Sequence, residues 1–351
     1  MPRILFVCPD NPKPSGGIKQ IYRQVDVLNA NGFNAHILHE NNGFKCRWFD
    51  NNTPVVYSKP LFEAIKKLKP VTPSLKSKIK QQIKSVTASF KSNNDTALTE
   101  DDILVFPEVY GPRIATLYPG IRKVIYNQGA YQTFFGHGLD LNNLDTPYLS
   151  DDLLAVIVNS EDAQKYMKLA FPNLDVHRVH YGFNSKDFSI ATDKKRQICF
   201  MPRRLRSDII QVINILKFRG ALEGWTIKPI ENMSEAQVAE CMKESAIFLS
   251  FNINEGFGMP PAEAMACGCV VVGYTGQGGN EIFNPEFSYP VTDRNVQEYV
   301  KTLEQVIKDY NVDDTPFKAK GQSASEFILK EYSMGVEQDD IVRTWKAITN
   351  N

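Results

Sequence analysis

Two glutamates enclose a short run rich in glycine and proline in the second half of this 351-residue chain. The run reads EGFGMPPAE, from Glu255 to Glu263, and lies between the apolar, strand-like segments 246–251 and 269–273. A helix that begins at the Pro-Pro pair would present free backbone N–H groups and the positive end of its dipole at the end of a strand, which favours an anion. A carboxylate beside a bound phosphate can accept hydrogen bonds from sugar hydroxyls. The run therefore favours a site that combines both kinds of contact.

Three arginines follow another apolar segment, in the sequence MPRRLR at 201–206. They are Arg203, Arg204 and Arg206. A planar guanidinium binds phosphate oxygens bidentately, so this cluster suits a pyrophosphate. Loops at the carboxyl ends of parallel strands converge on one crevice, which would bring the cluster close to Glu255. The alternatives are a surface cluster that pairs with Asp208 and, for Glu263, a simple interaction with a helix dipole.

A third loop that favours ligand binding follows the first apolar segment of the chain. Gly16 and Gly17 precede a helical pattern over 18–30, and without a Cβ they would let a phosphate or a sugar approach the backbone. A plain tight turn is the alternative. Neither this loop nor 276–281 has the G-x-G-x-x-G spacing of a dinucleotide site.

Short apolar segments alternate with helical patterns along both halves of the chain, and this rhythm restarts after Asp187. The strand-like segments are 4–8, 33–38, 103–106, 123–126, 154–159, 198–201, 225–230, 246–251 and 270–273. The alternation predicts an α/β fold of two Rossmann-like, doubly wound parallel domains. We expect the two domains to be joined near 184–196.

Bulk composition excludes several classes of function. Forty basic and forty acidic residues cancel, which gives no reason to expect nucleic acid as a partner. No segment approaches the length of a membrane span, and the first residues lack the pattern of a signal peptide. The six cysteines include no CxxC pair, and Cys267-Gly-Cys269 has no nearby third ligand, so we expect no metal site and a reducing, cytoplasmic location.

The segment 59–94 differs from the rest because it carries nine lysines and one acid, Glu63, among apolar residues at helical spacing. This composition is typical of a solvated pair of amphipathic helices. The alternative is a surface that makes peripheral contact with an anionic membrane or an anionic acceptor.

The sequence resembles the family 4 retaining glycosyltransferases of the GT-B fold along nearly its whole length, because several short segments occur in the same order. The segments that carry the resemblance are SGGIKQIYRQVDVLNANG (15–32), VIVNSEDAQKYM (156–167), VHYGFNSKDF (179–188), MPRR (201–204), EGFGMPPAEAMACGCVVVG (255–273) and GGNEIF (278–283). The resemblance implies two Rossmann-like domains that face each other across a cleft. The expected ranges are 1–185 for the acceptor side, 186–333 for the donor side and 334–351 for a helix that crosses back to the first domain.

The resemblance also implies roles for individual residues. Glu263 would bind the ribose of a nucleotide-sugar, and Glu255 would bind the transferred sugar near its 3- and 4-hydroxyls. Arg203 and a second cation, Arg204 or Arg206, would bind the pyrophosphate. The predicted donor-binding residues are Gly16, Gly17, Arg206, Gly256, Phe257, Gly258, Met259 and Glu263, and the predicted catalytic residues are Glu255, Arg203, Arg204 and Gln128. Gln128 stands where many members have His, and Gln can bond a sugar hydroxyl but cannot titrate.

The function that the resemblance implies is transfer of a sugar from a nucleotide-sugar, UDP-, GDP- or similar, to a glycan, lipid-linked or small-molecule hydroxyl. We expect retained anomeric configuration, no metal, no cofactor and a place in glycan or polysaccharide biosynthesis. The alternatives are a sugar-nucleotide epimerase or hydrolase of the same fold, and a non-catalytic protein that binds nucleotide-sugars.

Overall fold

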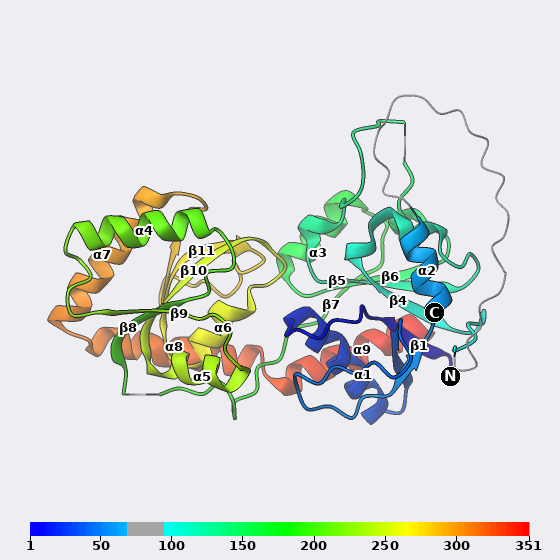
Figure 1. Ribbon diagram of the computed structural model, residues 1–351, viewed down its shortest axis with the longest axis horizontal. Coiled ribbons are helices and arrows are strands. Elements are labelled where there is room, and N and C mark those ends of the chain that lie inside the picture. Colours follow the sequence, from blue (N-terminus) through cyan, green and yellow to red (C-terminus); the bar gives the residue numbers. More distant parts are fainter. Residues whose placement is uncertain (69–94, 143, 192, 351) are drawn as a thin grey trace. The chain divides into compact units, whose positions relative to one another are not determined.

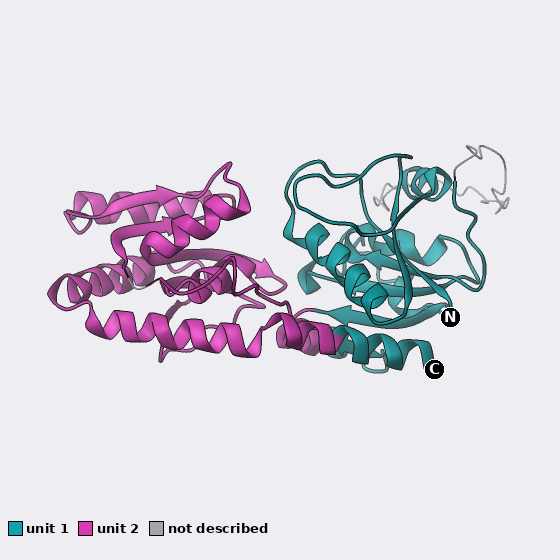
Figure 2. Cartoon of the chain, turned by 90° about the horizontal axis from the view of Figure 1, so that it is seen from below, with its two compact units in different colours: residues 1–158, 167–177, 341–351 teal, residues 159–166, 178–340 magenta. Residues whose placement is uncertain are grey.

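The computed structural model describes residues 1–68, 95–142, 144–191 and 193–350. They form two compact units, each with its own sheet (Figure 2). Unit 1 consists of residues 1–158, 167–177 and 341–351, and unit 2 of residues 159–166 and 178–340. The division falls inside α3 (Glu161–Ala170) and α9 (Met334–Asn350), so each of these helices contributes residues to both units. Residues 178–185, which we expected in the first domain, group with unit 2.

The described residues of unit 1 contain a seven-stranded sheet in the order β3-β2-β1-β4-β5-β6-β7. Its strands are β1 (Arg3–Val7), β2 (Asn34–His39), β3 (Val55–Tyr57), β4 (Ile103–Pro107), β5 (Arg122–Asn127), β6 (Leu153–Val158) and β7 (Val176–Arg178). Its helical segments are α1 (Gly16–Ala30), α2 (Lys59–Lys67), η1 (Glu108–Thr116), η2 (Ala130–Gln132) and η3 (Pro147–Leu149). The pairs from β3 to β6 are parallel, and β1, β4 and β5 lie side by side near the middle.

Unit 2 contains a five-stranded parallel sheet in the order β12-β11-β10-β8-β9 within the described residues. Its strands are β8 (Lys195–Phe200), β9 (Thr226–Pro229), β10 (Ser245–Glu255), β11 (Val270–Gln277) and β12 (Ser288–Val291). Its helices are α4 (Arg206–Phe218), α5 (Glu235–Glu244), α6 (Met259–Ala266), α7 (Val296–Val312) and α8 (Thr315–Glu331). Figure 1 shows α4 and α7 on one face of this sheet and α5, α6 and α8 on the other.

Each sheet has a topological switch point, where the strand order reverses. In unit 1 it lies between β1 and β4, and in unit 2 it lies between β8 and β10. Ligands of open α/β sheets bind outside the carboxyl ends of the strands at such points. A ligand site is therefore expected in the loops that follow these four strands.

Local sequence accounts for the elements that frame these loops. The strands of unit 2 consist largely of Val, Ile, Leu and Phe, and they bury that surface against α4 and α7, with Tyr299 and Phe251 stacked 4.6 Å apart. Ser234 and Gln237 form a capping box at the start of α5. In unit 1, Trp345 of α9 packs against Phe6 of β1 at a ring distance of 5.7 Å and is fully buried.

The predicted α/β class is confirmed in each unit, and most predicted strands agree with the observed ones to within a few residues. Three short strands were not predicted: β3, β7 and β12. Each has three or four residues, and all three lie at sheet edges, where strands are often very short.

Only the beginning of the lysine-rich segment 59–94 falls within the described residues. There, α2 buries Leu61, Phe62 and Ile65 against unit 1, while Lys66 pairs with Glu40. The apolar side of α2 therefore faces the protein. Residues 69–94 lie outside the described residues, so membrane contact through 59–94 stays a prediction. No helix among the residues described is both long and apolar enough to cross a membrane.

Candidate functional site

The switch point of unit 2 brings two predicted site residues together. Arg204, in the loop after β8, and Glu255, the last residue of β10, form an ion pair with 2.5 Å between Arg204 Nε and Glu255 Oε1. Both side chains remain partly accessible, with 39% and 21% exposed. A cation and a carboxylate therefore meet at the position where an α/β sheet of this topology binds its ligand.

The end of β10 is irregular, and this irregularity positions Glu255. The pairing of β10 with β11 shifts register between Asn252 and Glu255, and Asn254 has a left-handed backbone with φ 49°. The backbone N–H of Asn254 donates to Gln277 Oε1 at 2.8 Å, which holds the bulge. Bulges next to sites commonly re-aim a side chain, and this one brings the Glu255 carboxylate to Arg204.

Charge at Glu255 is set by two opposing effects. Burial raises the pKa of this carboxyl, whereas the guanidinium groups of Arg204 and Arg203 lower it and so offset part of that rise. The ion pair thus helps to keep a half-buried carboxylate ionised, which is the form that accepts two or more hydrogen bonds from hydroxyl groups.

The three arginines have different surroundings. Arg203 is exposed, and its charge acts on Glu255 from a distance. Arg206 is the first residue of α4 and lies beside Glu231, with 3.9 Å between Arg206 Nη1 and Glu231 Oε1. Of the two candidates for the second cation, Arg204 is the one that contacts Glu255.

Helix α6 begins at the glycine-rich loop, as the sequence indicated. Gly258 is its N-cap with φ 93°, a left-handed backbone conformation that favours glycine, and a Cβ there would lie 2.9 Å from Asn252 Nδ2. Met259 and Glu263 are both partly exposed, in the first and second turns of α6. Glu263 therefore lies one helical turn beyond the N–H groups that would bind an anion.

Phe257 anchors the loop and does not line a ligand surface. Its ring is buried and packs against Tyr181 at 5.7 Å and Tyr332 at 5.1 Å. The Tyr332 hydroxyl donates to Glu281 at 2.9 Å, and Glu281 in turn pairs with Arg178 at 2.6 Å. This network fixes the Gly256–Gly258 backbone, so any ligand contact made by Phe257 comes from its main chain.

The switch point of unit 1 holds the remaining predicted residues. Gly16 and Gly17 form the first turn of α1, and Gln128 follows β5. Gln128 Nε2 donates to the Gly17 carbonyl at 3.0 Å, and a Cβ on Gly17 would lie 2.4 Å from Gln128 Oε1. The carboxamide therefore occupies the space that the missing side chain of Gly17 leaves.

Glu108 was not predicted as a site residue, although it lies directly at the switch point. It follows β4, is only 4% exposed, and its Oε2 accepts the backbone N–H of Gln128 at 3.0 Å. Burial raises its pKa to about 7, and backbone N–H groups of Gln128, Glu108 itself and Gly129 oppose the rise. The only signal in the sequence was an acid two residues after the strand-like segment 103–106.

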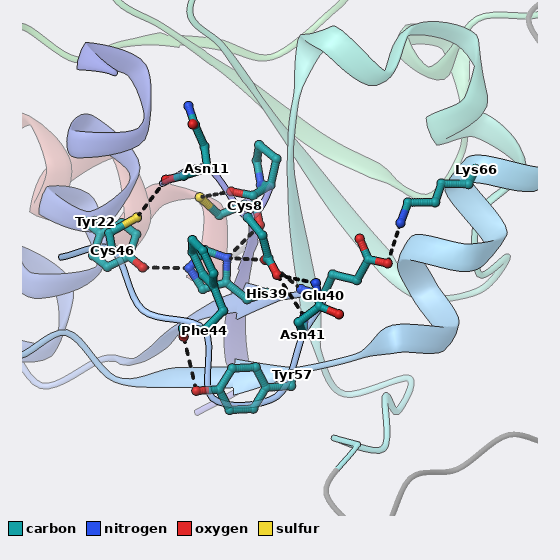
Figure 3. A network of polar contacts seen from close by, with 12 residues as sticks. Cys8, Asn11, Tyr22, His39, Glu40, Asn41, Phe44, Cys46, Tyr57 and Lys66 are labelled. Carbon is teal, nitrogen blue, oxygen red and sulfur yellow. Dashed lines mark hydrogen bonds and ion pairs between the residues drawn. The ribbon is translucent and has the colours of Figure 1, made fainter. Parts of the chain in front are cut away.

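A buried polar network holds the loop that leads from β1 to Gly16 (Figure 3). With its proton on Nδ1, His39 donates to the Cys8 carbonyl at 2.9 Å and to Asp10 at 3.0 Å, while its Nε2 accepts from the Tyr22 hydroxyl at 2.6 Å. Burial alone would raise the pKa of Asp10, but hydrogen bonds from His39, Asn41 and Glu40 hold it below its ordinary value. The network makes the loop a rigid support for the first turn of α1.

In the part of the chain that the structure describes, no group of three or more His, Cys, Asp and Glu side chains is arranged to bind a metal ion. The cysteines of the 267–269 run are buried, and Cys269 Sγ donates to the Met242 carbonyl at 3.0 Å.

Known proteins resemble this chain in part of its sequence and in its fold. Residues 224–321, which include the Glu255 loop and α6, match the sequence model of the family described as glycosyl transferases group 1. This part of the chain is similar to the group 1 glycosyltransferases. Over 219 residues it is 26% identical to an alpha-1,6-glucosyltransferase of Actinobacillus pleuropneumoniae. That alignment covers 59% of this chain, which spans 61% of the length of that relative.

Solved structures share the fold along the whole chain. TarM superposes with a TM-score of 0.65 at 12% identity, covering 100% of this chain and 99% of TarM. Sucrose-phosphate synthase from Thermosynechococcus elongatus gives 0.64 at 12% identity, with both chains fully covered. HepE of Anabaena, crystallised with UDP and glucose, gives 0.61 at 12% identity and covers 99% of this chain and all of HepE. These similar structures confirm the predicted fold class.

Proposed function

We propose that this chain transfers a sugar from a nucleotide-sugar to an acceptor hydroxyl, with retained anomeric configuration and without a metal. The observation that carries the proposal is the ion pair of Arg204 and Glu255 at the switch point of unit 2, of which residues 224–321 match the group 1 family model. Glucose is the first candidate for the transferred sugar, because the relative is described as a glucosyltransferase. UDP is the first candidate for the nucleotide, because HepE was crystallised with UDP-glucose.

In the proposed binding mode, the diphosphate lies at the first turn of α6 and is neutralised by Arg203 and Arg204. Glu255 accepts hydrogen bonds from the sugar, and Glu263 accepts them from the ribose. The conformation of Gly258 and the buried ring of Phe257 support this mode, because they fix the backbone N–H groups around which the donor would bind. In unit 1, Gly16, Gly17 and Gln128 are proposed to contact the substrate.

The proposed reaction needs no protein nucleophile. The bond between the anomeric carbon and the phosphate oxygen breaks, and the acceptor oxygen forms its bond to the same face of that carbon. The proton of the acceptor hydroxyl passes to the departing phosphate oxygen. Positioning and stabilisation of the growing diphosphate charge then supply the rate, and this is the role proposed for Arg203 and Arg204.

Donor binding tests the first half of the proposal. UDP-glucose should raise the unfolding temperature of the chain more than GDP-, dTDP- or ADP-glucose does, because only a ligand of the native state stabilises it. Glu263→Ala should abolish most of this shift through loss of the ribose contacts, whereas Glu240→Ala, an exposed residue of α5, should leave it unchanged. No shift with any of these donors, with or without EDTA, would contradict the proposal.

A further inference from the structure

Glu108 and the loop it holds carry an inference that goes beyond the proposed function and rests on it. The Glu108 carboxyl lies between the loops that follow β4 and β5, and its Oε2 accepts the backbone N–H of Gln128 at 3.0 Å. Its Oε1 lies 3.4 Å from the position of a Cβ on Gly129. The carboxyl therefore contacts the backbone of Gln128 and lies beside Gly129.

The side chain of Gln128 reaches the first turn of α1. Gln128 Nε2 donates to the Gly17 carbonyl at 3.0 Å. The orientation of this carboxamide depends on the Gln128 backbone, whose N–H is bound by Glu108. Asn127 also supports the loop, since its Oδ1 accepts the Gly129 N–H at 3.1 Å. Only Glu108 can change its charge within this set of contacts.

Charged groups on the elements around Glu108 have other partners. Arg113, in η1, donates from Nε to the Tyr110 carbonyl at 3.2 Å and from Nη1 to the Ile65 carbonyl at 3.4 Å. Asp10, after β1, is bonded to His39 and Asn41. Tyr110 packs edge-on against Phe106 at 6.3 Å, and burial raises its pKa far above neutrality. On the β5 side, Gln132 is neutral and reaches the same Gly129 position.

We propose that Glu108 is a positioning residue whose ionised carboxylate holds Gln128 in the orientation that binds substrate, so that substrate affinity depends on its protonation. A carboxylate accepts a backbone N–H more strongly than a neutral carboxyl does. Protonation therefore loosens the Gln128 peptide and the carboxamide it carries. The burial-raised pKa of about 7 places this change in the neutral range.

The backbone amide of Gln128 reports the proposed switch directly, without any substrate. In NMR spectra of the full chain, its ¹H and ¹⁵N shifts should titrate between pH 5.5 and 8.5 with a midpoint near 7. Glu108→Gln retains an acceptor but cannot ionise, and it should abolish this titration. Glu100→Gln, an exposed residue of the same unit, should leave it in place. A Gln128 amide that does not titrate, or that titrates equally in Glu108→Gln, would overturn the proposal.

The kinetic consequence is a change in KM with little change in kcat. Wild-type KM for the donor should fall about fivefold from pH 6 to pH 8, the difference expected between a neutral and a charged acceptor. Glu108→Gln should give a flat profile, and Glu108→Asp should show a raised KM throughout because its carboxylate is one methylene too short. Equal pH profiles in wild type and Glu108→Gln would refute the link to binding. Failure to find any sugar transfer would refute the proposed function instead, because the Gln128 titration is observed without substrate.

Discussion

Replacing Glu108 by Gln should stabilise unit 1 at neutral and alkaline pH, because it removes a carboxylate that the fold buries. The folded pKa is about 7 and the ordinary value is 4.5. The folded state therefore holds the proton more tightly than the unfolded state. Stability from this group is fully present below pH 4.5 and is lost as the pH rises through 7.

The size of the effect follows from the two pKa values. At pH 8 the free energy of unfolding of the wild type is about 3 kcal/mol lower than that of a chain with a neutral side chain at this position. At pH 5 the difference is about 1 kcal/mol. Glu108→Gln should recover these amounts at each pH. The side chain is 4% exposed, so solvent screening reduces the effect little.

Hydrogen exchange measures this difference in stability within unit 1, around β4 and β5. Peptides from β4 and β5 should exchange more than 100-fold more slowly in Glu108→Gln than in wild type at pH 8, the rate ratio that corresponds to about 3 kcal/mol. At pH 5 the ratio should be several-fold, and peptides of unit 2 serve as the internal control. If exchange in Glu108→Gln is not slower than in wild type at pH 8, or is slowed by the same factor at pH 5 and pH 8, Glu108 titrates normally.

Two further substitutions test how the site loops are supported. Gly17→Ala would place a Cβ 2.4 Å from Gln128 Oε1, so we expect it to displace the carboxamide and to lower transfer activity. Adding Gln128→Ala removes the clash. The loss of activity in the double mutant, as a free energy, should therefore be smaller than the sum of the losses in the two single mutants. Phe257→Ala should destabilise unit 2 by about 3–5 kcal/mol, because it empties the aromatic cluster with Tyr181 and Tyr332. Exchange of β10 peptides measures that loss, and unchanged exchange would contradict the anchoring role.

Much of the fold could be predicted from the sequence, because buried parallel strands are nearly continuous apolar runs. The segment 246–251 was located in this way, and it forms the first half of β10. The short strands β3, β7 and β12 were missed because three or four residues carry little periodicity. Their pairing depends on neighbouring strands, which only the fold brings together.

The candidate site was predictable where chemistry and local pattern coincide. The Glu255 loop and the arginines follow strands, and the topology of a parallel sheet brings the ends of such strands to one edge. The pairing of Arg204 rather than Arg206 with Glu255 could not be predicted, because it depends on the turn at Leu205, where φ is 45°. Glu108 was missed for a related reason, since burial and contact with Gln128 arise only when β4 and β5 pair.

The central claim is that the chain transfers sugar from a site centred on Arg204 and Glu255. Its most direct test is acceptor-dependent release of UDP from UDP-glucose across an acceptor panel, measured in wild type, Arg204→Ala, Arg206→Ala and the surface control Arg219→Ala. We predict a loss in kcat of about 100-fold or more for Arg204→Ala, the range expected when one group that stabilises a developing anion is removed. The loss for Arg206→Ala should be much smaller, and Arg219→Ala should match wild type. Equal losses for Arg204→Ala and Arg206→Ala, or UDP release that needs no acceptor, would contradict the account.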